Sequence, residues 1–109
     1  MDFDVSVKRE ERCVQVRVEG EAGLGRVLSL LRVLELDSRD WSQHLVLVDL
    51  RTLQPPLDYE GQAQVAGAAR RAFLTLRKIA ILSAPGGAGE KAGVRLFEDE
   101  AAARQWLEC

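Results

Sequence analysis

Hydrophobic and polar residues alternate along the first twenty positions in two rows, which are separated by the charged residues 8–12. The rows are Phe3, Val5 and Val7, then Val14, Val16 and Val18. A period of two around a charged turn is typical of a β-hairpin with one buried face. Cys13 falls on the opposite face from Val14, and Gly20 ends the predicted hairpin.

From Leu24 the apolar residues recur at helical spacing, which predicts a helix over residues 24–37. The segment 44–50 is short and almost wholly apolar, which is typical of a strand covered on both faces. Residues 53–58 contain two consecutive prolines and are expected to form a loop. Helical spacing returns over residues 59–76. The predicted inner face of that helix consists mainly of small residues: Ala63, Ala66, Ala69, Ala72, Phe73 and Leu76.

The last third of the chain repeats this alternation. Residues 78–83 predict a second buried strand, residues 85–93 a glycine-rich loop with one helical turn, and residues 94–97 a final strand. Asp99 is the expected N-cap of a closing helix whose inner face holds Ala102, Ala103, Trp106 and Leu107. A leading hairpin followed by alternating helices and strands predicts one α/β domain over residues 1–109, with a mixed, mostly parallel sheet of five strands.

Composition removes several classes of function. The 109 residues carry 15 basic and 17 acidic side chains, and the two signs are mixed along the chain rather than clustered. Nucleic-acid binding relies on clustered Lys and Arg, so we expect no nucleic-acid partner. The acidic start lacks a signal-peptide pattern, and no apolar run is long enough for a membrane span. We therefore expect a soluble cytoplasmic protein.

Three stretches give the sequence a family likeness. They are the strand 46–51, which closes in Asp-Leu, the strand 78–82, and the strand with its Ala-rich helix over residues 94–107, which ends in Trp-Leu. In these the chain resembles the STAS superfamily, and within it the SpoIIAA-like branch of anti-sigma-factor antagonists. The resemblance implies a SpoIIAA-like fold and a bacterial-type signalling module. It implies a protein partner, such as a kinase-like or anti-sigma regulator.

The chain departs from that family at its functional box. Anti-sigma-factor antagonists carry Asp-Ser-Ser/Thr-Gly at the start of the helix after the Asp-Leu strand, and phosphorylation of a serine there blocks partner binding. The matching residues here are Asp58, Tyr59, Glu60 and Gly61, with no serine or threonine. We take these four as the candidate partner-binding residues. Glu60 either mimics a permanent charge or is an ordinary acid at a helix N-terminus, and we favour the second interpretation.

Other candidate chemistry is sparse. Gly86, Gly87 and Gly89 follow a strand and are the candidate ligand or anion loop, although we favour a flexible crossover loop. His44 is the only histidine, and Cys13 and Cys109 lie far apart in the sequence, so no metal-ligand spacing exists. We expect reduced thiols rather than a structural disulfide. No nucleophile with a base is visible, and we expect no catalytic residue, metal or cofactor.

Two functions follow. The first is a non-enzymatic regulatory module that binds a protein through residues 53–61 without a phosphorylatable serine. The alternative is a carrier of a lipid or another small apolar ligand, held in space left by Ala63, Ala66 and Ala69.

Overall fold

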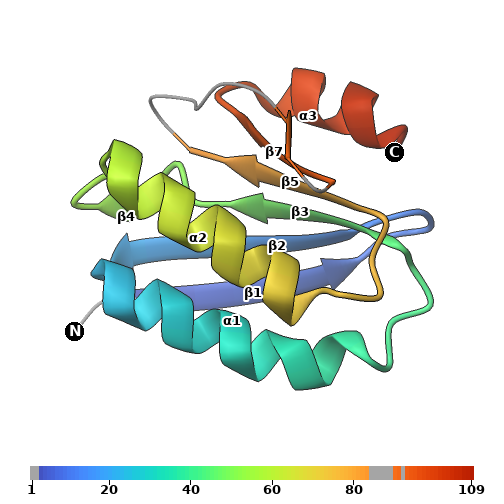
Figure 1. The fold of residues 1–109 in the computed structure, drawn as a ribbon, viewed down its shortest axis with the longest axis horizontal. Helices are drawn as coiled ribbons and strands as arrows, with labels where there is room; N and C mark the ends of the chain where they lie inside the picture. The colour runs from blue at the N-terminus through green and yellow to red at the C-terminus, as the bar shows by residue number, and fades with distance from the viewer. Residues whose placement is uncertain (1–2, 84–89, 92) are drawn as a thin grey trace.

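The computed structural model describes residues 3–83, 90–91 and 93–109. Within them, seven strands form one sheet in the spatial order β1-β2-β3-β5-β7-β6, and β4 pairs with β2 (Figure 1). The strands are β1 (Phe3–Arg9), β2 (Val14–Glu21), β3 (Leu45–Asp49), β4 (Leu53–Gln54), β5 (Lys78–Leu82), β6 (Glu90–Lys91) and β7 (Val94–Phe97). The helices are α1 (Leu24–Ser38), α2 (Tyr59–Ala72) and α3 (Glu100–Leu107). The predicted α/β fold class is confirmed, and two two-residue strands add to the five expected.

The middle of the sheet is parallel. β3 pairs with β2 on one side and with β5 on the other, and β5 pairs in turn with β7. All five residues of β3 are buried, as expected for an apolar strand without polar alternation. β1 joins β2 as the antiparallel arm of the predicted hairpin. The mixed, mostly parallel topology is therefore the predicted one.

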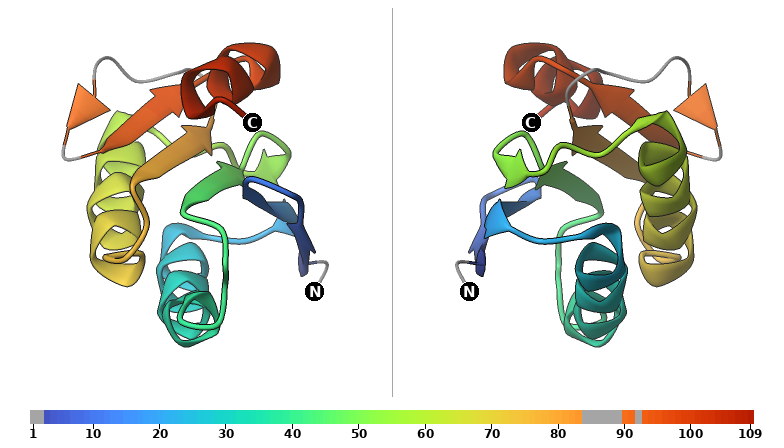
Figure 2. Two further views of the ribbon diagram at one scale, coloured as in Figure 1. Left: turned by 90° about the vertical axis from the view of Figure 1, so that its right-hand side faces the viewer. Right: turned by 90° about the vertical axis from the view of Figure 1, so that its left-hand side faces the viewer.

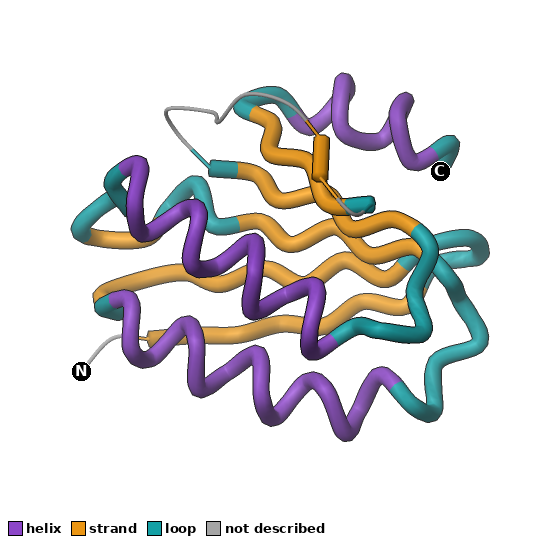
Figure 3. Tube along the Cα trace, viewed as in Figure 1, coloured by secondary structure: helices purple, strands orange, loops and turns teal. Residues whose placement is uncertain are grey.

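Helices cover both faces of the sheet, but unequally. α1 and α2 pack side by side on one face, and α3 packs on the other near β5 and β7 (Figure 2). Because strand residues alternate between faces, Val14 belongs to the core under α1 and α2, whereas Cys13 belongs to the core under α3. Among the described strands, α3 packs mainly against β3, β5 and β7 on this second face, and Figure 3 shows α3 at the far end of the sheet from β1. Side chains of β1 and β2 on this face, such as Lys8 and Arg17, are exposed.

The inner face of α2 differs from the predicted one. Ala63 is exposed, and Ala66 is only partly buried. Ala69 and Ala72 are buried as predicted, and so are Phe73 and Leu76 just beyond the helix. The other buried residues of the helix are Gly61, Gln62 and Val65. The predicted stripe was rotated because it followed the small apolar residues and passed over Gln62, a polar residue that is nevertheless buried. Val65 and Phe73 fill the space next to the sheet, so the volume assigned to an apolar ligand is occupied by the chain itself.

Several boundaries also shift. α2 ends at Ala72 rather than near Leu76, because Phe73 leaves the helical conformation with φ -111° and ψ 51°. The Arg70 guanidinium donates hydrogen bonds to the carbonyl oxygens of Phe73 and Leu76 beyond the helix end. Leu53 and Gln54, expected in a loop, pair with Gly20 and Glu21 of β2, and the prolines lie outside that ladder. In α3, Ala103 and Leu107 are buried as predicted, whereas Ala102 is exposed. The helical turn expected within residues 85–93 lies largely outside the described residues, of which 90–91 form β6.

Candidate functional site

The parallel strands β2, β3 and β5 all end at one edge of the sheet, which we call the carboxyl edge. In open α/β sheets ligands bind outside the carboxyl ends of the strands. The chain leaves β3 at this edge, passes through β4 and then enters α2 at Tyr59 (Figure 1). The topology therefore brings the predicted partner-binding residues to the edge where functional groups are expected.

Two of the four predicted residues, Asp58 and Gly61, build the start of the helix. Asp58 is the N-cap of α2, and its Oδ1 accepts a hydrogen bond of 2.7 Å from the backbone N–H of Gly61. Gly61 is buried, and a Cβ at that position would lie 3.0 Å from the same Oδ1. An aspartate followed by a glycine three residues later is thus explained by helix capping and close packing.

The other two residues, Tyr59 and Glu60, face solvent. Tyr59 is 76% exposed, the largest exposed fraction among the exposed large hydrophobic residues of the described chain. Glu60 is also exposed and lies in the first turn of α2, where a negative charge is favourable. The rigid cap therefore presents an unburied aromatic ring and a carboxylate together at the helix start.

We expect Asp58→Ala to lower the free energy of unfolding by about 1 kcal/mol, because the Gly61 N–H loses its acceptor. Asp58→Asn keeps a side-chain oxygen at the cap and should remain close to wild type. Urea denaturation of the three proteins measures both values. An Asn variant as unstable as the Ala variant would show that the charge, and not the hydrogen bond, holds the helix start.

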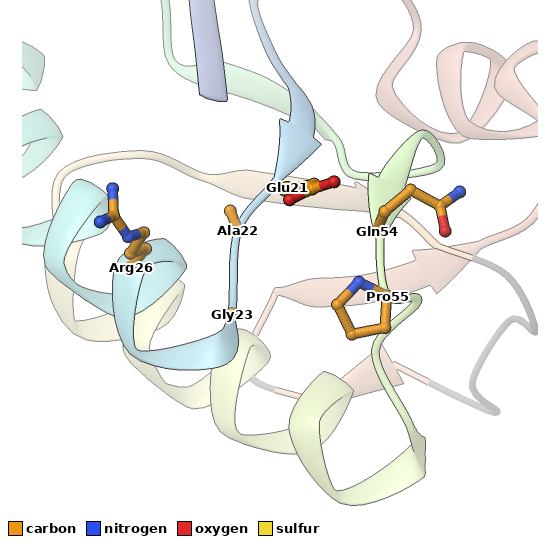
Figure 4. Close-up of a pocket in the computed structure, with 6 residues that line it drawn as sticks. All are labelled: Glu21, Ala22, Gly23, Arg26, Gln54 and Pro55. Carbon is orange, nitrogen blue, oxygen red and sulfur yellow. The ribbon is translucent and has the colours of Figure 1, made fainter. Parts of the chain in front are cut away.

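A shallow groove lies at the same edge. It has a volume of about 450 Å³ and runs between the start of α1 and the β4 segment (Figure 4). Its lining consists of Glu21, Ala22, Gly23, Arg26, Gln54 and Pro55. Pro55 comes four positions before Tyr59 in the sequence, so one wall of the groove belongs to the segment that leads into α2. The sequence alone did not indicate it, because its two walls come from segments about thirty residues apart.

Gln62 supports this region from inside. The side chain is 2% exposed, and its Nε2 donates a hydrogen bond of 3.1 Å to the carbonyl oxygen of Leu57, in the loop before α2. Leu57 is itself buried. This link between the helix and its preceding loop fixes the approach to Tyr59. The sequence analysis did not predict this hydrogen bond. The signal that could have indicated it is a polar residue, Gln62, on the buried side of a helix.

Asp49, at the end of β3, is committed to an ion-pair network. Its carboxylate accepts hydrogen bonds from the Arg51 backbone N–H, Nε and Nη2, at 3.1, 3.0 and 2.9 Å. Arg51 Nη2 also contacts Glu100 at 3.1 Å, which joins β3 to the start of α3. Burial raises the pKa of Asp49, but the hydrogen bonds and charge of Arg51 outweigh it and leave that pKa below its usual value. The group is a structural anchor rather than a free acid or base.

The remaining candidates add little chemistry. His44 is exposed just before β3. Gly86, Gly87 and Gly89, the candidate anion loop, lie outside the described residues. Among the residues that the structure describes, no three His, Cys, Asp or Glu side chains gather to hold a metal ion. No helix in the described ranges is long and apolar enough to span a membrane.

Known structures support the fold. No family model matches the sequence, and no curated protein matches it significantly. An anti-sigma factor antagonist from Mycobacterium paratuberculosis superposes with a TM-score of 0.60 at 12% identity, covering 99% of this chain and 96% of that one. A DUF3478-family protein with a SpoIIAA-like fold from Shewanella loihica PV-4 gives a TM-score of 0.51 at 16% identity, covering 96% and 93%. The arrangement of hairpin, parallel strands and helices in this chain is therefore a SpoIIAA-like fold.

Proposed function

We propose that this chain is a non-enzymatic, cytoplasmic regulatory module of one domain that binds a protein partner through the start of α2. The observation that carries the proposal is the exposed pair Tyr59 and Glu60, held on a helix start that Asp58 and Gly61 fix. Exposed aromatic residues on a rigid support are typical anchors of protein interfaces. One structural neighbour is an anti-sigma factor antagonist, which supports a partner of the anti-sigma or kinase-like class.

The partner should present complementary chemistry. Glu60 and Asp58 place negative charge at the tip of α2, so a basic side chain on the partner would pair with them. Tyr59 would insert its ring into an apolar pocket, and the groove beside Pro55 could receive a protruding partner side chain. Because Tyr59 and Glu60 stand where antagonists of this family carry hydroxyl residues, we infer that binding here proceeds without a serine-phosphorylation switch.

We do not propose the alternative function, a carrier of a lipid or another small apolar ligand. The space assigned to an apolar ligand is filled by Val65 and Phe73, both fully buried. Ala63, which was expected to line that space, is exposed. The structural neighbours give no support for lipid binding.

We expect Tyr59→Ala to weaken capture of the partner about tenfold, the loss typical of an aromatic anchor. Glu60→Lys should weaken it as well, by reversing the charge that the partner meets. Neither change should move Tm by more than a few degrees, since both side chains are exposed. Affinity purification from the native cell, with quantitative mass spectrometry of each variant, identifies the proteins whose capture falls.

Two matched controls make the experiment specific. Leu74→Ala removes a side chain that is 75% exposed, nearly the same as Tyr59, but lies beyond the other end of α2. Glu11→Lys makes the same charge change as Glu60→Lys, but in the hairpin turn at the opposite edge of the sheet. A protein lost with Tyr59→Ala and Glu60→Lys and retained with both controls is the expected partner. Unchanged capture of every bound protein would remove this surface from consideration.

A further inference from the structure

The two cysteines, separated by almost the whole sequence, meet in the fold. Cys13 lies between β1 and β2 in the hairpin turn, and Cys109 comes two residues after the end of α3. Arg12 Nη1 donates a hydrogen bond of 3.3 Å to the carbonyl oxygen of Glu108, so the residues next to the two cysteines are in direct contact. Figures 1 and 2 both show the hairpin turn and the end of α3 at the same end of the sheet.

The thiols share one apolar cluster. Cys13 is fully buried in the core under α3, together with Leu45 and Leu107, and Cys109 packs against that cluster while remaining partly exposed. The backbone N–H of Cys109 donates to the carbonyl oxygen of Arg104 at 3.0 Å, which fixes the chain beyond the helix. The Cys109 thiol is therefore held beside the buried Cys13 thiol and still reaches solvent.

The two thiols differ in environment. Burial, with hydrogen bonds to the Cys109 thiol and to Glu10, raises the pKa of Cys13 to about 12. The Cys13 Sγ–H donates to Glu10 Oε1 at 3.5 Å, and Arg104 Nη1 holds that same oxygen at 3.0 Å. Cys13 is thus a protonated thiol inside the fold that donates to the Glu10 carboxylate, whereas Cys109 is the thiol that a dissolved oxidant meets first.

We propose that Cys13 and Cys109 form a redox-sensitive pair that closes into an intramolecular disulfide on exposure to hydrogen peroxide. Cys109 loses its proton to solvent, and its sulfur attacks one peroxide oxygen. The O–O bond breaks, the leaving hydroxide becomes water, and Cys109 becomes a sulfenic acid. Cys13 then attacks the Cys109 sulfur, which forms the S–S bond and breaks the S–O bond. The hydroxide released from Cys109 takes up the Cys13 proton and leaves as water, so two thiols are oxidised while one peroxide is reduced to two waters.

The bond would tie the hairpin turn to the end of α3 and enclose nearly the whole chain in one covalent loop. A loop of this length strongly reduces the entropy of the unfolded chain, so oxidation should raise Tm by about 10 °C. Reversible disulfides of this kind are consistent with a cytoplasmic protein, where persistent ones are rare. The proposal does not depend on the partner surface, which lies at the opposite edge of the sheet.

The test treats the reduced, full-length chain with hydrogen peroxide, then blocks free thiols and digests with trypsin under non-reducing conditions. Cleavage after Arg12, Arg17 and Arg104 should leave a single linked species that joins peptide 13–17 to peptide 105–109. We expect the monomer to lose the mass of two hydrogens, to gain about 10 °C in Tm, and to return to its starting state with dithiothreitol. Dimers linked through Cys109, or sulfinic acid at Cys109 with Cys13 still free, would overturn the proposal.

Variants test the roles of the groups. Cys109→Ser leaves the core intact and should keep Cys13 unoxidised in the folded protein. Glu10→Gln should speed disulfide closure several-fold, because the negative charge that keeps the proton on Cys13 is lost, whereas Glu11→Gln, its exposed neighbour in the turn, should close at the wild-type rate. Equal rates for the two glutamine variants would overturn the role of Glu10, and rapid oxidation of Cys13 in Cys109→Ser would overturn the order of the steps.

Discussion

Replacing Phe73 with alanine should lower the free energy of unfolding by about 3–5 kcal/mol, the range for deleting a buried aromatic ring. Phe73 is 0% exposed and lies at the point where α2 ends. Its ring stacks on that of Trp41, which precedes β3, with centroids 5.7 Å apart and planes 29° apart. Truncation removes this stacking and leaves a cavity between the helices and the sheet, which a rigid sheet cannot collapse to fill.

Urea denaturation at neutral pH measures the loss, and the next residue supplies the control. Leu74 is 75% exposed, so Leu74→Ala should change the free energy of unfolding by less than about 0.5 kcal/mol. Phe73→Leu should fall between the two, because it keeps much of the buried volume. Losses of similar size in Phe73→Ala and Leu74→Ala would show that the end of α2 is not packed as described.

The order of the elements could be predicted because it depends on local patterns. Alternation in β1 and β2 and continuous apolar runs in β3 and β5 distinguish strands with one covered face from strands with two. The cap of α3 was equally local, since Asp99 accepts a hydrogen bond from the N–H of Ala102, three residues later. Such signals lie within a few residues of the feature that they specify.

The details of packing could not be predicted, because they are set by contacts between distant segments. Gln62 is polar, yet the loop at Leu57 supplies a buried acceptor for its amide, and the buried face of α2 therefore includes it. The pairing of β4 with β2 joins Gly20 to Leu53, which are far apart in the sequence. No local pattern contains this information, and a single sequence cannot show it.

The same limit applies to the candidate site and to the cysteine pair. The sequence placed Tyr59 at a helix start, and the structure shows that its ring is exposed. The sequence did not show that Asp58 and Gly61 form the helix cap, whereas Tyr59 and Glu60 remain available to contact a partner. The contact between Cys13 and Cys109 arises only because α3 returns across the face of the sheet that Cys13 faces.

Asp49→Asn should lower the free energy of unfolding by about 2 kcal/mol at pH 7, the value expected when buried hydrogen bonds to a charged group become neutral. The Asp49 side chain is 5% exposed and binds Arg51 through both carboxylate oxygens, while Arg17 Nε lies 3.5 Å away. The amide of Asn keeps the shape but offers one acceptor, and its NH₂ group would face the guanidinium of Arg51. The anchor between β3 and the start of α3 therefore weakens without a cavity being created.

The difference between Asp49→Asn and wild type should depend on pH. The pKa of Asp49 is lower in the folded protein than in the unfolded chain, so its contribution is complete above the unfolded value, near 4, and is lost as pH falls through the folded value. Urea denaturation from pH 7 to pH 2 should show the two proteins converging at the acid end. Asp37→Asn, an exposed aspartate in the last turn of α1, should follow wild type within about 0.5 kcal/mol throughout. A gap between Asp49→Asn and wild type that stays constant down to pH 2 would mean that packing at the end of β3, and not the charge of Asp49, stabilises this edge of the sheet.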